Sequence, residues 1–331
     1  MEEKKKEGDG EMREIEIGPN DGGQRLDRFL SKYLPKASPS FLQKQVRKKK
    51  IKVNKQRARA EQIIAVGDRI QFYLYEEVLQ PLEEEARPRR SRISLSILYE
   101  DDHICIIDKP AGLLSHAASK KDYGNNLVDA LEAYLIDKGD YIPRLEHSFR
   151  PALANRLDFN TAGLVIGLKS HRGALAINRA LSEGKIDKYY RAYCHGFMEG
   201  HFTIDRSLEK QGQTMELSQE GQEAITEVEV LEGHPDWSYI QVRLRTGRYH
   251  QIRAHLASIG HPLVGDRRYG KKGDGSFPHQ LLLSFGLVFH EIEGMDELEG
   301  LKVFSNQRAE FDRLKLAVDR AFQNERGIHG R

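Results

Sequence analysis

The chain has 331 residues and is 39% hydrophobic, so we expect one large domain with a substantial core and a smaller module beside it. Its 52 basic and 50 acidic residues nearly cancel to a net charge of +2, so local patches are more informative than the total. The two cysteines have no partner at zinc-ligand spacing, and no signal-peptide pattern or long apolar run occurs. We expect a reduced, cytoplasmic protein without structural metal, export signal or membrane insertion.

The first folded unit is predicted over residues 15–79, after a charged tail over residues 1–14 that has almost nothing to bury. A short strand near IEIG precedes RLDRFLSKYL, whose apolar residues recur at helical spacing: Leu26, Phe29, Leu30 and Tyr33. Beyond Pro35, Ser38 or Ser40 can cap a second helix, SFLQKQVRKKK. The strand-like KIKVN and the alternating DRIQFYLYEEV then complete a small α/β module.

The second unit is predicted over residues 93–310, after a charge-dense linker with two prolines over residues 80–92. Its expected strands include HICIID, GLVIGLK, KYYRAYCHG and WSYIQVRLRTG, and its expected helices include NLVDALEAYLID and HRGALAINRALSEG. This mixture predicts an α+β domain with a mixed, mainly antiparallel sheet. Over residues 311–331 we expect a C-terminal helix and tail: NQRAEFDRLKLAVDRAFQN reads as one amphipathic helix and ERGIHGR as a frayed end.

A basic stripe lies in the small module, without an acidic residue among its charges. It consists of Lys44, Arg47, Lys48, Lys49, Lys50, Lys52, Lys55, Arg57 and Arg59. Such a density favours a polyanion partner, because counterion release on binding phosphates gives a large, salt-sensitive affinity. The alternative is a solubilising surface. RNA or DNA is the expected partner.

This module resembles the alpha-L RNA-binding motif, named for the fourth protein of the small ribosomal subunit. The matching segments are RLDRFLSKYL, SPSFLQKQVRKKKIKVN and the closing VGDRI. The resemblance implies that the second helix and the following turn lie against structured RNA, which assigns RNA binding to Lys44, Arg47, Lys48, Lys49, Lys50 and Lys52. Lys50 stands where relatives often have glycine in the helix-to-strand turn.

The segment ANRLDFNTAGLVIGLKS, residues 154–170, places Arg156 and Asp158 on one side of an extended chain. A tight bend is expected at Thr161, Ala162 and Gly163, before an apolar strand. Taken alone, this Arg-x-Asp pattern favours a surface ion pair or a turn-capping aspartate.

Four segments together resemble the RluA-type pseudouridine synthases, in the expected order over residues 93–290. Besides residues 154–170, they are YEDDHICIIDKPAGLLSH, KYYRAYCHG and LRTGRYHQIRAHLASIGHPLVGDRRYG. The family converts uridine to pseudouridine: the N1–C1′ bond breaks, the base rotates, and C5 joins C1′. An anionic group at the sugar and a base for the C5 proton are needed, without cofactor or metal.

The resemblance assigns the site residues. Asp158 is the anionic group, acting as a nucleophile or as a base on the sugar, and Arg253 pairs with it. Tyr190 stacks on the flipped base and relays the C5 proton, whereas Tyr189 points to the opposite face of its strand. Arg156 binds RNA by filling the gap that the flipped base leaves. Leu282 lines the base pocket, although core packing is the simpler reading of that residue.

Other readings remain open at this stage. We interpret His250 and His255 as structural or as RNA contacts, since a zinc site would need another ligand. The chain could be a non-catalytic ribosome-assembly protein that binds RNA, a glycoside or nucleoside hydrolase, or a DNA-binding protein. Hydrolases usually pair two carboxylates, and no second acid accompanies Asp158. We expect a monomeric enzyme acting on large-subunit ribosomal RNA, with transfer RNA as the second possibility.

Overall fold

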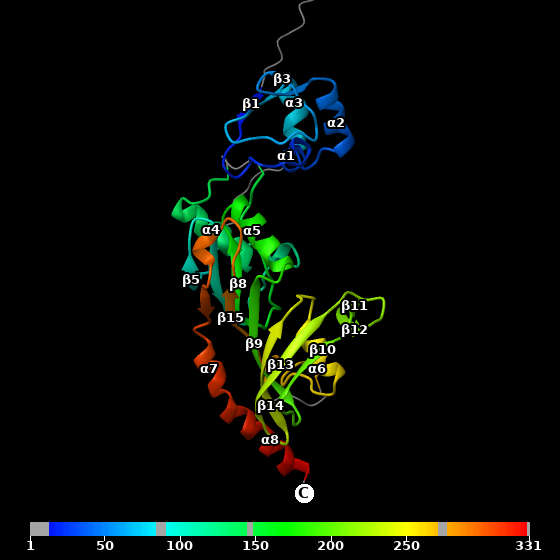
Figure 1. The fold of residues 1–331 in the computed structure, drawn as a ribbon, viewed down its shortest axis with the longest axis vertical. Helices are drawn as coiled ribbons and strands as arrows, with labels where there is room; N and C mark the ends of the chain where they lie inside the picture. The colour runs from blue at the N-terminus through cyan, green and yellow to red at the C-terminus, as the bar shows by residue number, and fades with distance from the viewer. Residues whose placement is uncertain (1–12, 84–90, 144–147, 271–276, 330–331) are drawn as a thin grey trace, which may run out of the picture. The chain divides into compact units, whose positions relative to one another are not determined.

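The computed structural model describes residues 13–83, 91–143, 148–270 and 277–329. Two compact units are distinguished (Figure 1). One is built mainly from the first 90 residues and takes in Glu132–Pro151 and Lys169–Arg172. The other contains Ser91–Leu131, Ala152–Leu168 and Gly173–Arg331. No helix among the described residues is long and apolar enough to cross a membrane.

The small unit is a four-stranded sheet in the order β1-β4-β2-β3, with every pairing antiparallel. Its elements in chain order are β1 (Arg13–Glu16), α1 (Leu26–Tyr33), α2 (Pro39–Arg47), β2 (Ile51–Val53), β3 (Gln56–Arg57), β4 (Arg69–Phe72), α3 (Glu76–Leu79) and a 3₁₀ turn at Gln80–Leu82. Helix α1 buries Leu26, Phe29 and Leu30 on one face. Helix α2 begins at Pro39 because the Ser38 hydroxyl accepts a hydrogen bond from the Phe41 N–H.

Three sequence predictions for this unit need correction. Strand β1 begins at Arg13, so residues 13 and 14 belong to the sheet and not to a tail; the rest of the predicted tail lies outside the described residues. The strand predicted for DRIQFYLYEEV ends at Phe72, and Glu76–Leu79 is helical with two glutamates in its first turn, where the helix dipole favours them. The predicted linker starts with a 3₁₀ turn, and its residues 84–90 lie outside the described residues.

The turn between α2 and β2 places Lys49, and not Lys50, in a left-handed conformation (φ 58°). The Lys49 N–H donates to Val46 O and the Lys50 N–H to Gln45 O, the pattern that ends many helices with glycine at the left-handed position. A side chain there costs energy that glycine avoids.

We therefore expect Lys49→Gly to raise the free energy of unfolding by about 0.5–1 kcal/mol in urea titrations. Lys50→Gly is the matched control, because Lys50 does not have a positive φ. That control should be neutral or destabilising, and equal gains from both substitutions would contradict this account of the turn.

The large unit is built on a ten-stranded sheet whose main path is β10-β13-β14-β9-β15-β8-β6-β5; β16 pairs with β15 and β7 with β8. The strands are β5 (Ile97–Glu100), β6 (Ile104–Lys109), β7 (Ala152–Leu153), β8 (Ala162–Leu168), β9 (Ile186–His195), β10 (His201–Asp205), β13 (Ile225–Gly233), β14 (Trp237–Leu244), β15 (Leu282–Phe289) and β16 (Lys302–Phe304). Only the pairing of β15 with β8 is parallel. The predicted α+β fold with a mixed, mainly antiparallel sheet is confirmed.

Helices and a separate hairpin complete this part of the chain: α4 (Leu127–Lys138), α5 (His171–Ser182), α6 (Gln251–Ser258), α7 (Arg308–Arg313), α8 (Lys315–His329), and the two-stranded sheet of β11 (Leu208–Gln211) and β12 (Thr214–Leu217). The single C-terminal helix that we predicted is wrong, because α7 ends at a cap on Leu314, whose N–H donates to Phe311 O. Nor does the helix stop before ERGIHGR: α8 continues to His329. Val318 of α8 packs with Tyr193 and Trp237 of the sheet.

Candidate active site

Asp158 opens a turn that leads into β8. The Thr161 N–H donates to Asp158 O at 3.0 Å, so the bend comprises residues 158–161 and not Thr161–Gly163 as predicted. Gly163 lies in β8 with φ 111°, and a Cβ atom there would be 2.0 Å from Ser284 O of the neighbouring β15. Only glycine allows these two strands to approach so closely, and this close pairing marks where β8 begins and the turn from Asp158 to Thr161 ends.

The backbone on both sides of Asp158 is held by the loop that follows β6. The Ser115 hydroxyl donates to Leu157 O (2.8 Å) and accepts from the Leu157 N–H (3.2 Å). On the other side, Phe159 O accepts from the Gly112 N–H at 2.9 Å and from Lys109 Nζ at 3.3 Å. Lys109 is fully buried, and burial lowers its pKa to about 8. These contacts leave little freedom in the position of the Asp158 Cα.

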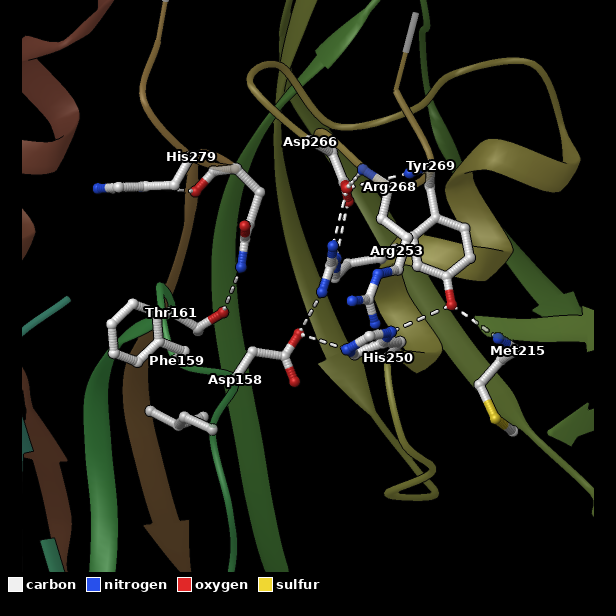
Figure 2. Close-up of polar contacts among 12 residues, drawn as sticks. Asp158, Phe159, Thr161, Met215, His250, Arg253, Asp266, Arg268, Tyr269 and His279 are labelled. Carbon is white, nitrogen blue, oxygen red and sulfur yellow. Dashed lines mark hydrogen bonds and ion pairs between the residues drawn. The ribbon is translucent and has the colours of Figure 1, made fainter. Parts of the chain in front are cut away.

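Arg253 of α6 joins two carboxylates (Figure 2). Its Nη1 lies 2.8 Å from Asp158 Oδ2, and its Nε and Nη2 lie 2.7 and 2.8 Å from the two oxygens of Asp266. Arg253 lies on a helix and is only 7% exposed, so it is not a surface arginine. The bidentate pair with Asp266 orients the guanidinium, and its remaining nitrogen is directed at Asp158.

Asp266 is a buried carboxylate with four donors. Besides Arg253, the N–H groups of Arg268 and Tyr269 donate to its Oδ1 at 2.9 and 3.1 Å. Burial alone would raise the pKa of Asp266, but the hydrogen bonds from Arg253 and the two backbone groups hold it below the ordinary value. The ionised Asp266 in turn raises the pKa of Arg253, so this guanidinium stays charged.

His250 approaches the same oxygen of Asp158. It precedes α6 with φ 51°, and its Nε2 lies 3.5 Å from Asp158 Oδ2. Its ring stacks on Tyr249 at a centroid distance of 3.7 Å, and its Nδ1 is 3.1 Å from the Tyr269 hydroxyl. That hydroxyl accepts a hydrogen bond from the Met215 N–H of β12 at 2.7 Å (Figure 2).

The protonation of His250 gives a testable pH effect on stability. Burial lowers the pKa of His250 to about 4, and the nearby Arg253 and Arg268 act in the same direction, against Asp158 and Asp266. Between about pH 6.5 and pH 4 the unfolded chain binds this proton and the folded chain does not, so stability decreases as the pH falls through that window. We expect His250→Asn to make the decrease in the free energy of unfolding shallower, as measured by urea titrations between pH 7 and 4.5.

The matched control is His201→Asn, at an exposed position of β10. Its stability should follow that of the unmodified chain at each pH. Parallel curves for all three proteins would contradict the assignment of a buried neutral imidazole.

Tyr190 and Leu282 lie on one face of the sheet. Tyr190 of β9 is buried, and burial together with the charge of Asp158 raises its pKa to about 12, against a hydrogen bond with Ser284. Leu282 of β15 is also buried and stands opposite Ala192, two residues from Tyr190. Because residues two apart on a strand share a face, both side chains project to the same side.

Most of the side chains predicted to contact RNA are exposed. Arg156 is exposed and makes no hydrogen bond or ion pair within the part of the chain that the structure describes. Five of the six basic side chains assigned to RNA binding are exposed, and none forms an ion pair with a described residue; these are Lys44, Arg47, Lys48, Lys49 and Lys50, while the partly buried Lys52 lies over the Tyr73 ring. His255, by contrast, is fully buried and bonded to Thr226, a structural role.

The structure adds three side chains to which sequence reasoning gave no role: Lys109, Asp266 and Tyr269. All three lie in segments that carried the family resemblance, but nothing in the order of residues indicates that they converge on Asp158. Asp266 follows Gly265, which has φ 76° and whose Cβ would lie 2.2 Å from His279 O, so the backbone requires glycine there, but this does not identify Asp266 from the sequence. In the described residues no group of three or more His, Cys, Asp and Glu side chains could hold a metal ion.

Comparison with protein families agrees with this arrangement. Residues 103–258 match the model of RNA pseudouridylate synthase, and residues 24–70 match the S4 domain. The fold also resembles the solved structure of human RNA pseudouridylate synthase domain containing 1, with a TM-score of 0.50 at 21% identity over 67% of this chain and 85% of that one. The class of protein is therefore an RNA pseudouridine synthase that carries an RNA-binding S4 domain.

Curated relatives define the family further. An uncharacterized RNA pseudouridine synthase of Aquifex aeolicus is 33% identical over 80% of this chain and 82% of its own length. Ribosomal large subunit pseudouridine synthase D of Haemophilus influenzae is 32% identical (77% and 76%), and synthase C of Escherichia coli is 30% identical (81% and 82%). The chain belongs to the RluA-type family of RNA pseudouridine synthases, as its sequence motifs indicated.

Proposed function

We propose that this enzyme isomerises specific uridines of large-subunit ribosomal RNA and that Asp158 is the residue that acts on the sugar. The observation that carries the assignment is the 2.8 Å contact between Asp158 and Arg253, whose guanidinium is itself fixed by the buried Asp266. An oriented cation beside a carboxylate stabilises negative charge at the reacting centre, in a site that partly excludes water. The relatives named for the ribosomal large subunit support the choice of RNA.

The reaction exchanges one bond for another. The N1–C1′ bond breaks, Asp158 acts as a nucleophile at the sugar or as a base on it, and the rotated uracil joins C1′ through C5. The C5 proton then leaves and N1 gains one, so the atoms balance without a redox step. Tyr190, with its pKa raised to about 12, is a neutral phenol that stacks on the base and relays the C5 proton.

The target base has to leave its helix or loop to reach Asp158. Extrusion costs a few kcal/mol, and a side chain that fills the vacated position lowers this cost. Arg156 is the candidate, since it is exposed and two residues before Asp158. Leu282, on the same sheet face as Tyr190, would form the apolar wall of the base pocket.

The S4 domain supplies affinity for the RNA backbone. We assign this function to residues 13–79, which include β1, and we assign catalysis to the domain that begins at residue 93 and precedes α8. Lys44 of α2 and Lys48, its C-cap, are four residues apart and exposed on one side of the helix end, next to Arg47. A row of exposed cations of this kind binds phosphates with little regard to sequence.

Lys44→Gln combined with Lys48→Gln should therefore weaken RNA binding without changing the rate at saturating RNA. Each lost phosphate contact should reduce the slope of log K against log salt by about 0.7–0.9, so the pair should reduce it by about 1.4–1.8. Filter binding from 50 to 300 mM salt measures the slope. The matched control, Lys185→Gln with Lys302→Gln, removes two exposed lysines of the larger unit and should leave the slope unchanged.

The decisive experiment is release of tritium from [5-³H]uridine-labelled RNA that lacks pseudouridine. We expect release from ribosomal RNA and a modified position that maps to the large subunit. Release from transfer RNA alone would change the substrate we assign to transfer RNA and leave the assigned reaction unchanged. Binding without release on either RNA would overturn the proposal in favour of a non-catalytic assembly protein.

We further propose that the enzyme acts as a monomer in the cytoplasm. A ribosomal RNA substrate, which the relatives' names support, is consistent with this compartment.

A further inference from the structure

The hydrogen bonds around His250 favour one of its two neutral tautomers. The Met215 backbone N–H can only donate, so the Tyr269 hydroxyl accepts that bond and has its own proton left to give. The acceptor within reach is His250 Nδ1, at 3.1 Å. A neutral imidazole that accepts at Nδ1 carries its proton on Nε2. That nitrogen faces Asp158.

The two donors near Asp158 converge on one of its oxygens. Arg253 Nη1 lies 2.8 Å from Oδ2 and His250 Nε2 lies 3.5 Å from the same atom. Among the residues that the structure describes, none donates a hydrogen bond to Oδ1. The carboxylate is therefore asymmetric, with one oxygen occupied by the protein and the other available.

We propose that His250 is a positioning residue for Asp158: its Nε2–H and the Arg253 guanidinium together hold Oδ2, so that Oδ1 is the oxygen that acts on the sugar. The inference rests on the proposed role of Asp158 and deepens it by naming the atom. Arg253 alone allows the carboxylate to turn about its Cβ–Cγ bond, whereas a second donor from another direction opposes that rotation. We expect this 3.5 Å contact to shorten to a hydrogen bond when RNA binds, because catalytic hydrogen bonds are often long in unliganded active sites.

The histidine is itself held in place, which supports a positioning role over incidental packing. Its ring lies between the stacked Tyr249 (3.7 Å) and the edge of Tyr269 (5.6 Å, 86°), and its side chain is only 4% exposed. The residue that orients it, Tyr269, is anchored in turn by its N–H to Asp266 and by its hydroxyl to Met215 of β12. The tautomer of His250 thus depends on the docking of the β11–β12 hairpin.

Two substitutions separate the donor at Nε2 from the acceptor at Nδ1. His250→Gln places an amide N–H as many bonds from Cβ as Nε2, so it can still donate to Asp158. His250→Asn reaches only as far as Nδ1, so it can accept from Tyr269 but cannot contact Asp158. Asparagine also tolerates the left-handed backbone at this position.

In single-turnover tritium release at saturating RNA, we expect His250→Asn to lower the rate by about 10- to 100-fold, the effect of losing one hydrogen bond to a charged group. His250→Gln should recover a substantial part of this loss. Because the lost donor stabilised the ionised carboxylate, the acidic limb of the rate profile of His250→Asn should move to higher pH. Tyr269→Phe should move it in the same direction with a smaller loss of rate.

Equal losses of rate for His250→Asn and His250→Gln, with both variants folded, would overturn the inference. An unchanged acidic limb of the rate profile of His250→Asn would also overturn it. If His250→Asn does not fold, an unchanged acidic limb in Tyr269→Phe would overturn it instead. A long-range ¹H–¹⁵N spectrum of histidine-labelled protein reads the tautomer without any activity, with the His250 signals assigned from the Gln variant. A proton on Nδ1 would also refute it. Failure of the unmodified enzyme on every RNA would instead refute the proposed function, and the spectrum would still report on His250.

Discussion

Asp158→Asn should reduce tritium release by at least about 10⁴-fold, the loss expected when the group that makes or breaks the key bond is removed. Asparagine has nearly the same shape as aspartate and can still accept the hydrogen bond from Arg253. It carries no negative charge, however, so it can neither attack C1′ nor take a proton from the sugar. The measurement is single-turnover release at saturating RNA, so that a change in affinity does not enter the rate.

The fold of this variant should be retained, since Arg253 keeps both of its contacts with Asp266. RNA affinity should change by less than a factor of about 3, because phosphate contacts dominate it. Asp187→Asn is the matched control: this buried carboxylate also pairs with an arginine, Arg243, at 2.7 Å, but in a separate cluster with His290. Activity that survives in Asp158→Asn, or is lost equally in the control, would contradict the assignment.

Local patterns in the sequence predicted most elements of the fold. Helix α1 follows from apolar residues that recur every three or four positions, and its Leu26, Phe29 and Leu30 are buried as that spacing requires. Where an element ended was harder to predict. The strand through DRIQFYLYEEV stops at Phe72 although alternation continues, and the chain turns into helix α3 at Glu76.

The break between α7 and α8 had no signal of its own. Neither proline nor glycine occurs there, and the apolar pattern runs through Leu314. The interruption is visible only once Phe311 and Val318 are seen to pack on the same cluster as Trp237. Such a contact joins residues about eighty positions apart, which no local pattern encodes.

The site shows the same contrast between local patterns and long-range contacts. A two-residue spacing drew attention to Asp158, but its contact with Arg253 spans 95 positions, and only the family resemblance suggested that pairing. Asp266 and Tyr269 could not be assigned at all, since their effects on Asp158 pass through Arg253 and His250. Residues that act through another side chain leave no motif of their own, and the folded arrangement is needed to find them.

The second large effect is expected at Arg253, where stability and activity can be separated. Arg253→Met removes the partner of Asp266, whose side chain is completely buried, and an uncompensated buried charge typically costs about 3–5 kcal/mol. The same substitution removes the cation beside Asp158, and the rate should fall by about 10²–10³-fold, as when one electrostatic donor is lost from an active site. Urea titration and single-turnover release measure the two effects on one preparation.

Adding Asp266→Asn to Arg253→Met distinguishes the two roles of the arginine. The neutral amide no longer needs a counter-ion and can still accept from the Arg268 and Tyr269 N–H groups, so the double variant should regain much of the lost stability. It should not regain activity, because nothing has replaced the cation at Asp158. Arg245→Met, which breaks an exposed pair with Glu227, should cost no more than about 1 kcal/mol and leave the rate unchanged. If the double variant recovers both stability and rate, Arg253 supports the fold alone and the electrostatic role assigned to it is wrong.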